Sequence, residues 1–356
     1  FYYIQLILNS KKIGLLAKKA KRIAFSKFLM INKLIIIAPN IKSGGGRELL
    51  EYLLEYLEEM YQDMYIVVYL DKSLAHIKKT NNREVHIVTR FFYKITLFYK
   101  KMDNALYFGN LPPLRQSTNS IVYIHNPYLL LDKKDILSSS VKFYLKYTLQ
   151  QWYIKYYITN VNSVACQNNN IKDVFSYKYK YSNVDVLPFF RLCKEDNFIK
   201  DEYDFCYVSL AHIHKNHILL LDALMILANK KYHLKIALTI EKSKIDLIRK
   251  IDHINNLGYV KIDNLGVISK AEVCQLYART RCLIFPSLNE TFGLGLVEAS
   301  EMGLDIIAPD LSYVYQIVEP SLIFDPNSSL SCANAIQTYM TTNDVKKSTS
   351  LVKNKI

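Results

Sequence analysis

The residues best suited to chemistry lie in one stretch, FPSLNETFGLGLVEAS at positions 285–300. An apolar strand is expected to stop at its proline, and Glu290 follows in a loop. Gly293 and Gly295 then open a predicted helix that contains Glu298. Glycines at a helix start let backbone N–H groups approach a phosphate, and the helix dipole favours its negative charge. Both carboxylates can face the strand end and accept hydrogen bonds from hydroxyl groups, so the pattern indicates a polyhydroxylated, phosphorylated ligand.

Short apolar segments alternate with helical patterns along the chain, and the alternation restarts after residue 188. Such alternation predicts right-handed crossovers and parallel sheets. The length also favours two domains over one. We therefore predict an α/β protein with two Rossmann-like domains, 31–190 and 191–356, whose parallel sheets face each other across a cleft that is the default ligand site. The expected strands are 33–38, 65–70, 85–88, 105–108, 121–125, 163–166, 205–209, 234–240, 283–286, 305–308 and 322–324, with a short one at 260; the expected helices are 47–61, 140–158, 217–229, 244–251, 270–280, 293–302 and 313–318.

The 285–300 stretch resembles the signature of glycosyltransferase family 4, in which two glutamates are separated by seven residues in a GT-B fold. The similarity extends over residues 264–326 and, more thinly, over 33–220. The resemblance implies that Glu290 contacts the donor sugar and Glu298 the nucleotide ribose. It also implies that backbone amides at Phe292, Gly293 and Leu294 hold the diphosphate.

Two features of the first predicted domain fit the same resemblance. Gly44, Gly45 and Gly46 match the glycine-rich loop that approaches the donor phosphate or the acceptor in such enzymes. A plain flexible turn would look the same. His125 ends a predicted strand where the family usually has a histidine near the reacting carbon of the donor sugar. The alternative is a histidine that is merely hydrogen-bonded at a strand end.

Lys215, after the first strand of the second predicted domain, matches the phosphate-binding lysine of the family. The arginine usual five residues earlier is replaced by Leu210, so diphosphate neutralisation would depend on Lys215 and helix dipoles, with help from His212. His212, His214 and His217 could suggest a metal, but no carboxylate or cysteine stands among them. An Asp-x-Asp motif, typical of metal-bound nucleotide sugars, is also absent from the sequence. We therefore expect a reaction without metal or other cofactor.

The charge pattern concerns possible partners. The formal net charge is +14, mostly from lysine, which favours polyanionic partners. A nucleic-acid partner is not expected, because a compact arginine-rich motif is lacking. Residues 1–30 form a basic segment with interleaved apolar residues, which suits either an anionic membrane surface or a solvated extension. Helix 140–158, rich in Tyr, Trp and Lys, could also rest at a membrane interface, although packing on its own sheet with lysines outward is the more ordinary interpretation.

Two further expectations concern compartment and membrane spans. Six scattered cysteines without a close C-x-x-C pair favour reduced core thiols in a cytosolic protein. The apolar runs are strand-sized, shorter than the ~20 residues that a membrane-spanning helix needs. We therefore expect a cytoplasmic protein, associated at most peripherally with the membrane.

The predicted function is a retaining hexosyl- or N-acetylhexosaminyltransferase. Its donor would be a UDP- or GDP-sugar and its acceptor a glycan or a lipid-linked molecule, in bacterial surface-polysaccharide assembly such as O-antigen or capsule. Two alternatives stay open: a nucleotide-sugar epimerase or hydrolase of the same architecture, and a non-catalytic basic scaffold that binds membrane or RNA.

Overall fold

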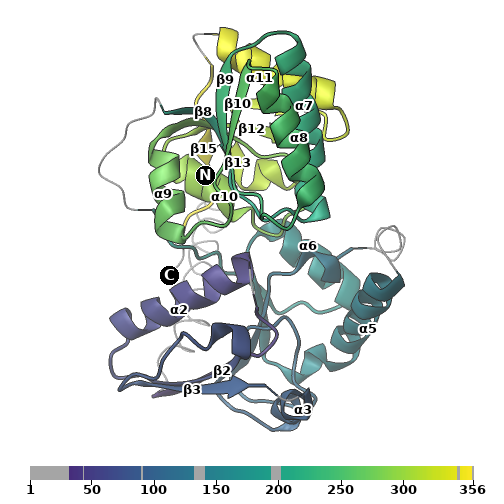
Figure 1. The fold of residues 1–356 in the computed structure, drawn as a ribbon. Helices are drawn as coiled ribbons and strands as arrows, with labels where there is room; N and C mark the ends of the chain where they lie inside the picture. The colour runs from purple at the N-terminus through teal and green to yellow at the C-terminus, as the bar shows by residue number, and fades with distance from the viewer. Residues whose placement is uncertain are drawn as a thin grey trace, which may run out of the picture. The chain divides into compact units, whose positions relative to one another are not determined.

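The structure is a computed structural model that describes residues 32–42, 44–89, 91–131, 141–193, 202–342 and 345–354, without the side chains of 91–94. The predicted basic segment 1–30 lies outside these residues. The chain divides into two compact units, one ending at Leu187 and the other beginning at Pro188 (Figure 1). Each unit has its own sheet and its own helices.

In the described part of the first unit, seven parallel strands form one sheet in the order β3-β2-β1-β4-β5-β6-β7. Buried Ile, Val and Leu side chains fill most of the central strands, as expected where helices cover both faces of a parallel sheet. The strands are β1 (Lys33–Ala38), β2 (Tyr65–Asp71), β3 (Arg83–Val88), β4 (Ala105–Tyr107), β5 (Ser120–Ile124), β6 (Ser163–Cys166) and β7 (Val184–Val186).

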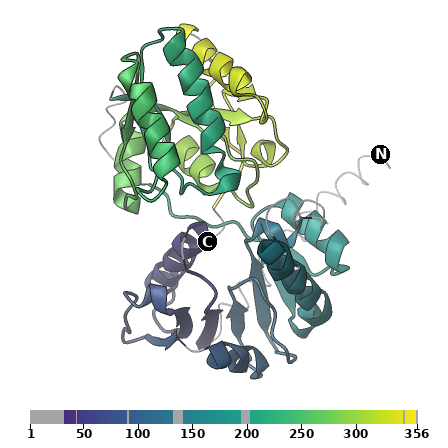
Figure 2. The same cartoon turned by 45° about the vertical axis from the view of Figure 1, so that its right-hand side comes forward.

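Helices cover the two faces of this sheet. Helix α2 (Gly45–Met60) buries an apolar face that includes Leu50, Leu53 and Leu57. In Figure 2, α2 lies on one side of the sheet, whereas α5 (Val141–Tyr157) and α6 (Asn169–Tyr179) lie on the other. Shorter pieces are α3 (Phe91–Tyr99), η1 (Lys72–Leu74), η2 (Pro127–Leu129) and η3 (Ile158–Asn160).

The second unit repeats this plan. Six parallel strands among its described residues follow the order β10-β9-β8-β11-β12-β14. They are β8 (Tyr203–Tyr207), β9 (Leu234–Leu238), β10 (Val260–Asn264), β11 (Thr280–Ile284), β12 (Asp305–Pro309) and β14 (Leu322–Phe324). A small antiparallel pair joins β13 (Val318–Glu319) to β15 (Thr349–Ser350). The helices are α7 (His217–Asn229), α8 (Ile245–Asn256), α9 (Lys270–Ala278), α10 (Leu294–Glu301) and α11 (Ser329–Thr341), with η4 (Ile213–Lys215) and η5 (Val314–Gln316).

Both sheets reverse their strand order at one place. In the first unit β1 lies between β2 and β4, and in the second β8 lies between β9 and β11. The chain winds outward in both directions from these strands, so the crossover helices diverge to opposite faces and leave a crevice at the carboxyl ends. The loops after β1 and β4, and after β8 and β11, are therefore where each unit can hold a ligand.

The structure contains the predicted strands and helices, with shifts of a few residues at their ends; the predicted helix at 313–318 is the single turn η5. It adds elements that the sequence analysis did not predict, among them α3, α6, α11 and β7. The expectation of reduced thiols is wrong for one pair, because Cys193 and Cys274 form a disulfide. The other four cysteines are buried and are not joined by a disulfide. In the parts of the chain described above, a search for helices long and apolar enough to cross a bilayer finds none.

Candidate functional site

The loops after β8 and β11 bring Lys215 and Glu290 together. Strands β8 and β11 are hydrogen-bonded neighbours, so their following loops start side by side. The carbonyl of His214 accepts hydrogen bonds from the amide of Leu288, at 2.8 Å, and from the hydroxyl of Ser287, at 3.2 Å. These bonds join the two loops, and Lys215 Nζ forms an ion pair with Glu290 Oε1. The structure thus places together two of the residues predicted from the sequence.

Aromatic side chains pack against this ion pair and hydrogen-bond to the backbone of its two loops. The buried Tyr207 hydroxyl donates to the carbonyl of Lys215 at 2.9 Å, and Lys215 Nζ lies 5.9 Å from the centroid of the Phe285 ring. The Tyr313 hydroxyl donates to the carbonyl of Ser287 at 2.5 Å. The loop that leads to Glu290 is therefore fixed by its backbone, which is the kind of support that pre-organises a binding group.

Helix α10 begins immediately after this loop. Gly293 is its N-cap and has a φ of +59°, a left-handed conformation that glycine adopts without strain. Helix geometry leaves the amides of Leu294 and Gly295 without an intrahelical acceptor. A Cβ on Gly295 would stand 3.2 Å from the Phe285 ring, so this turn packs tightly on the strand end. The arrangement is that of an anion-binding helix N-terminus beside the Lys215 ammonium.

Glu298 lies in the same helix and pairs with a residue that the sequence analysis did not single out. Lys270 Nζ forms an ion pair with Glu298 Oε1, and both side chains are mostly buried. Lys270 is the first residue of α9, a helix fixed by a capping box between Ser269 and Glu272. We call Lys215, Glu290, Lys270, Glu298 and the first turn of α10 the second-unit site.

The first unit brings together Gly46, His125 and a third residue, Asn110. Gly46 lies in the first turn of α2, after β1; Asn110 follows β4, and His125 follows β5. A Cβ on Gly46 would stand only 2.9 Å from His125 Nε2, so only glycine lets the helix backbone approach this ring. The ring also stands 5.2 Å from that of Phe108, between centroids. We call Gly46, Asn110 and His125 the first-unit site.

Asn110 determines which nitrogen of His125 carries the proton. The backbone N–H of His125 donates to Asn110 Oδ1 at 2.7 Å, and an N–H group can only donate. The Asn110 amide nitrogen must then be the group that stands 3.1 Å from His125 Nε2, where it donates. Nε2 is therefore an unprotonated acceptor. Burial also lowers the pKa of His125 to about 4, so the imidazole is neutral at pH 7.

Gly44 and Gly45 show a more modest role. Gly44 is the N-cap of α2 with a φ of +69°, and a Cβ on it would meet open space. Its carbonyl accepts from the amides of Arg47 and Glu48 at 2.9 and 3.3 Å. These glycines shape the helix start, and Gly46 is the member that touches His125.

The histidines around Lys215 do not converge. The rings of His212 and His214 are stacked 5.8 Å apart, whereas His217 packs on Tyr207 at 4.7 Å. Burial lowers the pKa of both His214 and His217 to about 4. Among the described residues, no three His, Cys, Asp or Glu side chains lie close enough to share a metal ion.

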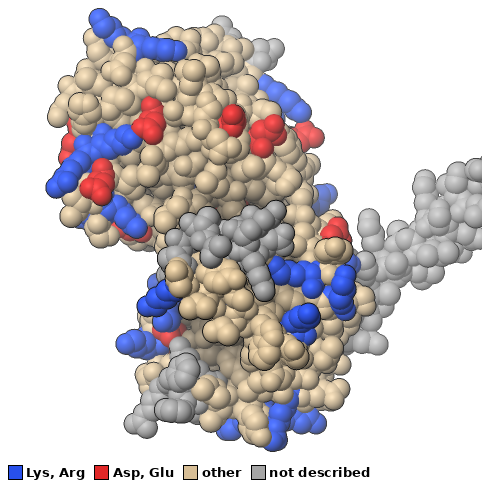
Figure 3. Space-filling view, turned by 90° about the vertical axis from the view of Figure 1, so that its right-hand side faces the viewer, with Lys and Arg blue, Asp and Glu red and all other residues tan. Residues whose placement is uncertain are grey.

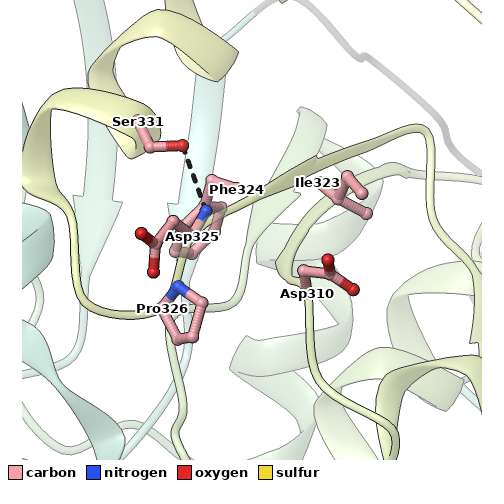
Figure 4. Close-up of a pocket in the computed structure, with 6 residues that line it drawn as sticks. All are labelled: Asp310, Ile323, Phe324, Asp325, Pro326 and Ser331. Atoms are coloured by element: carbon pink, nitrogen blue, oxygen red, sulfur yellow. Dashed lines mark hydrogen bonds between the residues drawn. The ribbon is translucent and has the colours of Figure 1, made fainter.

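A separate pocket opens where β12 and β14 end. It is lined by residues of β14, of the loops after β12 and β14, and of α11, including Asp310, Asp325 and Ser331 (Figure 4). The Ser331 hydroxyl and the Asp325 amide lie 3.0 Å apart at its side. None of the predicted site residues lines this pocket.

The amide of Asn110 can be tested by replacing it with a carboxylate. In Asn110→Asp, one oxygen still accepts from the His125 backbone, and the other faces Nε2 and favours a proton there. We expect the pKa of His125 to rise from about 4 toward or above the ordinary value of 6.5. An NMR titration of the imidazole between pH 3 and 8 measures it. An unchanged pKa would disprove the hydrogen-bond assignment.

The close approach of α2 can be tested with Gly46→Ala. The added methyl group must displace the His125 ring, and such overpacking costs about 1–3 kcal/mol. We expect a lower free energy of unfolding and a shifted His125 resonance. Gly109→Ala is the matched control, because its Cβ would stand at an ordinary 3.5 Å from Asn40. Equal effects of both substitutions would argue against a specific contact at Gly46.

Comparison with known proteins places these features in a family context. Residues 191–356 match the model of a family described as glycosyl transferases group 1. A comparison with curated protein sequences finds no match.

Solved structures with a similar fold cover both units. Anabaena HepE in complex with UDP and glucose has a TM-score of 0.60 and 16% identity, over 86% of this chain and 89% of that chain. Sucrose-phosphate synthase from Thermosynechococcus elongatus has a TM-score of 0.65 and 14% identity, over 87% and 90%. WaaG, a glycosyltransferase involved in lipopolysaccharide biosynthesis, has a TM-score of 0.60 and 11% identity, over 87% and 91%. The predicted GT-B fold is thus confirmed, and this fold and the group 1 match of residues 191–356 together support glycosyltransferase activity.

Proposed function

We propose that this protein transfers a sugar from a nucleoside diphosphate sugar to a hydroxyl of a glycan or lipid-linked acceptor, with retention of the anomeric configuration. The observation that carries the proposal is the Lys215–Glu290 ion pair beside the first turn of α10. A cation and helix amides suit a diphosphate, and a carboxylate next to them suits sugar hydroxyls. Family resemblance of the 285–300 stretch supports the same assignment.

The donor is proposed to bind along the second-unit site. The amides of Phe292, Gly293 and Leu294 and the Lys215 ammonium would take the diphosphate. Glu290, which forms an ion pair with Lys215, would accept hydrogen bonds from the sugar. Glu298 would accept from the ribose hydroxyls while Lys270 balances its charge. The donor base is proposed to be uracil or guanine; the complex of HepE with UDP-glucose supports uracil.

Transfer exchanges one C–O bond for another. The bond from C1 to the phosphate oxygen breaks, and the acceptor oxygen bonds to C1 from the same face. The leaving diphosphate takes the acceptor proton. Lys215 and the α10 amides stabilise the charge that grows on the leaving group, where pre-aimed donors are most effective.

The first-unit site is proposed to form the acceptor side. His125 is neutral, so it would contact the sugar without adding a charge. Its Nε2 accepts from Asn110, and the proton of the neutral ring lies on Nδ1. Gly46 gives the α2 backbone close access to the same ring.

The proposed setting is bacterial surface-polysaccharide assembly at the cytoplasmic face of the membrane, with hexose or N-acetylhexosamine as the sugar. The similarity to WaaG and the basic net charge support it. The Cys193–Cys274 bridge is an unusual feature for this setting, because disulfides are rare in the cytosol.

Metal independence is a prediction of its own. Because Lys215 and the helix amides supply the counter-charge, we expect the transfer rate to be unchanged after dialysis against EDTA. Donor consumption with and without added Mg²⁺ or Mn²⁺ measures this. A rate that falls with EDTA and returns with Mn²⁺ would contradict it.

The two glutamates are expected to act on different steps. Glu298→Gln should weaken UDP or GDP binding about 10- to 100-fold, as expected for hydrogen bonds to a charged group. Glu290→Gln should leave nucleotide affinity nearly intact and lower turnover about 100-fold or more, by analogy with the loss of one pre-aimed group. Calorimetry and nucleotide release measure the two effects.

Glu301→Gln is the matched control, because Glu301 lies on the same helix and is exposed. Full activity of both glutamate variants would disprove the assignment. Thermal stabilisation by neither UDP nor GDP would favour the scaffold alternative. A rate of donor consumption that does not depend on the acceptor would favour the epimerase or hydrolase alternative.

A further inference from the structure

Helix α5 has two apolar faces. One faces the core of the first unit: Tyr147 and Ile154 are buried, and the Gln151 amide donates to the carbonyls of Tyr128 and Leu131 at 3.0 and 2.9 Å. The other is a stripe whose members recur every three or four residues, the spacing of one helix face. The stripe consists of Val141, Leu145, Leu149, Trp152 and Tyr156, which are 73, 53, 65, 58 and 60% exposed.

This stripe is longer than the isolated apolar residues that are normal on a protein surface. Single exposed apolar residues are normal, but five in consecutive register extend over ~22 Å at 1.5 Å per residue. At 100° per residue the stripe points away from Tyr147 and Ile154. The side chains that hold α5 on the sheet therefore do not account for it.

The charges that α5 itself places beside the stripe have one sign. Lys142 and Lys146 border one side and Lys155 the other, and the α5 sequence contains no Asp or Glu. At the end of the neighbouring α6, the Nζ of the C-cap residue Lys180 lies 4.4 Å from the centroid of the Tyr177 ring, which is also exposed. Blue side chains predominate over red ones on the face of the first unit that Figure 3 shows in its lower part.

We propose that the exposed face of α5 docks on the surface of an anionic lipid bilayer. Apolar side chains would enter the boundary between headgroups and acyl chains, Trp152 and Tyr156 would lie at headgroup depth, and the lysines would extend to lipid phosphates. A second copy of this chain fits less well, because facing stripes would bring lysines together with no acid on α5 to oppose them.

The inference specifies the surface for the membrane association proposed above, but it does not need the transfer reaction. Helix α5 lies in the crossover from β5 to β6, and His125 follows β5 directly. Docking through α5 would hold the first-unit site near an acceptor anchored in the same bilayer. It would not affect a water-soluble acceptor.

Trp152 is the only tryptophan of the chain, so its fluorescence reports on the stripe directly. With the full chain, we expect a blue shift with vesicles of phosphatidylglycerol and phosphatidylcholine, and quenching by brominated lipid. Vesicles of phosphatidylcholine alone should have little effect, and high salt should weaken the response. If the protein sediments with vesicles but its Trp152 emission does not shift, the proposal is overturned, because another part of the chain then binds the membrane.

Variants test the same surface without relying on fluorescence. Leu145→Ser combined with Leu149→Ser should lower vesicle affinity at least tenfold, and Lys142→Gln with Lys146→Gln should remove the preference for anionic lipid. The control is Ile245→Ser with Leu330→Ser, which changes exposed apolar residues of the second unit. All variants should keep nucleotide-sugar turnover on a soluble acceptor. Unchanged vesicle binding of the Leu145/Leu149 variant would overturn the docking proposal. So would a wild-type protein that is a dimer when the variant is a monomer. Neither result would affect the proposed transfer reaction.

Discussion

The reversal of strand order in each parallel sheet is the constraint on which the rest depends. Neighbouring parallel strands end at the same edge, so the loops after β8 and β11 begin side by side, and those after β1 and β4 do likewise. Lys215 and Glu290 are 75 positions apart in the chain, yet their loops share hydrogen bonds through the His214 carbonyl. The position of each candidate site therefore follows from where its sheet reverses its strand order.

Mostly buried carboxylates give the second-unit site its electrostatic character. Glu290 and Glu298 each pair with a lysine, because a carboxylate withdrawn from water is costly without a partner. The proposed donor has to replace the Lys215–Glu290 pair, and it would do so by giving each side chain a new partner: phosphate for the ammonium and hydroxyls for the carboxylate. A ligand with only one of these groups would leave the other charge unpaired. This favours a sugar joined to a diphosphate over either alone.

The sequence predicted the residues whose signal is local. The glutamate pair, the glycines of α10 and Lys215 stand in motifs, and the strands have clear apolar runs. Lys270 and Asn110 escaped prediction because their roles depend on distant partners: Lys270 meets Glu298 on another helix, and Asn110 meets His125 on the next strand. Helices α6 and α11 were missed for another reason. The buried face of α6 has only three large residues, Ile171, Phe175 and Tyr179, among polar ones, and that of α11 consists mainly of Ala, Cys and Tyr rather than a row of leucines. The Cys193–Cys274 pair, 81 positions apart, had no sequence signal at all.

Helix α5 shows how a periodic pattern can mislead. Its apolar residues occupy two opposite faces, so the usual amphipathic signal is weak even though each face is clearly defined. Packing on the sheet accounts for Tyr147 and Ile154 and leaves Leu145, Leu149 and Trp152 in water. The structure thus distinguishes two faces that overlap in the sequence pattern: one packs on the sheet, and the other is exposed and is bordered on α5 by lysines. A surface that is apolar in the middle and cationic at its edges matches a bilayer whose headgroups are anionic, and this complementarity is a property of the fold rather than of any single residue.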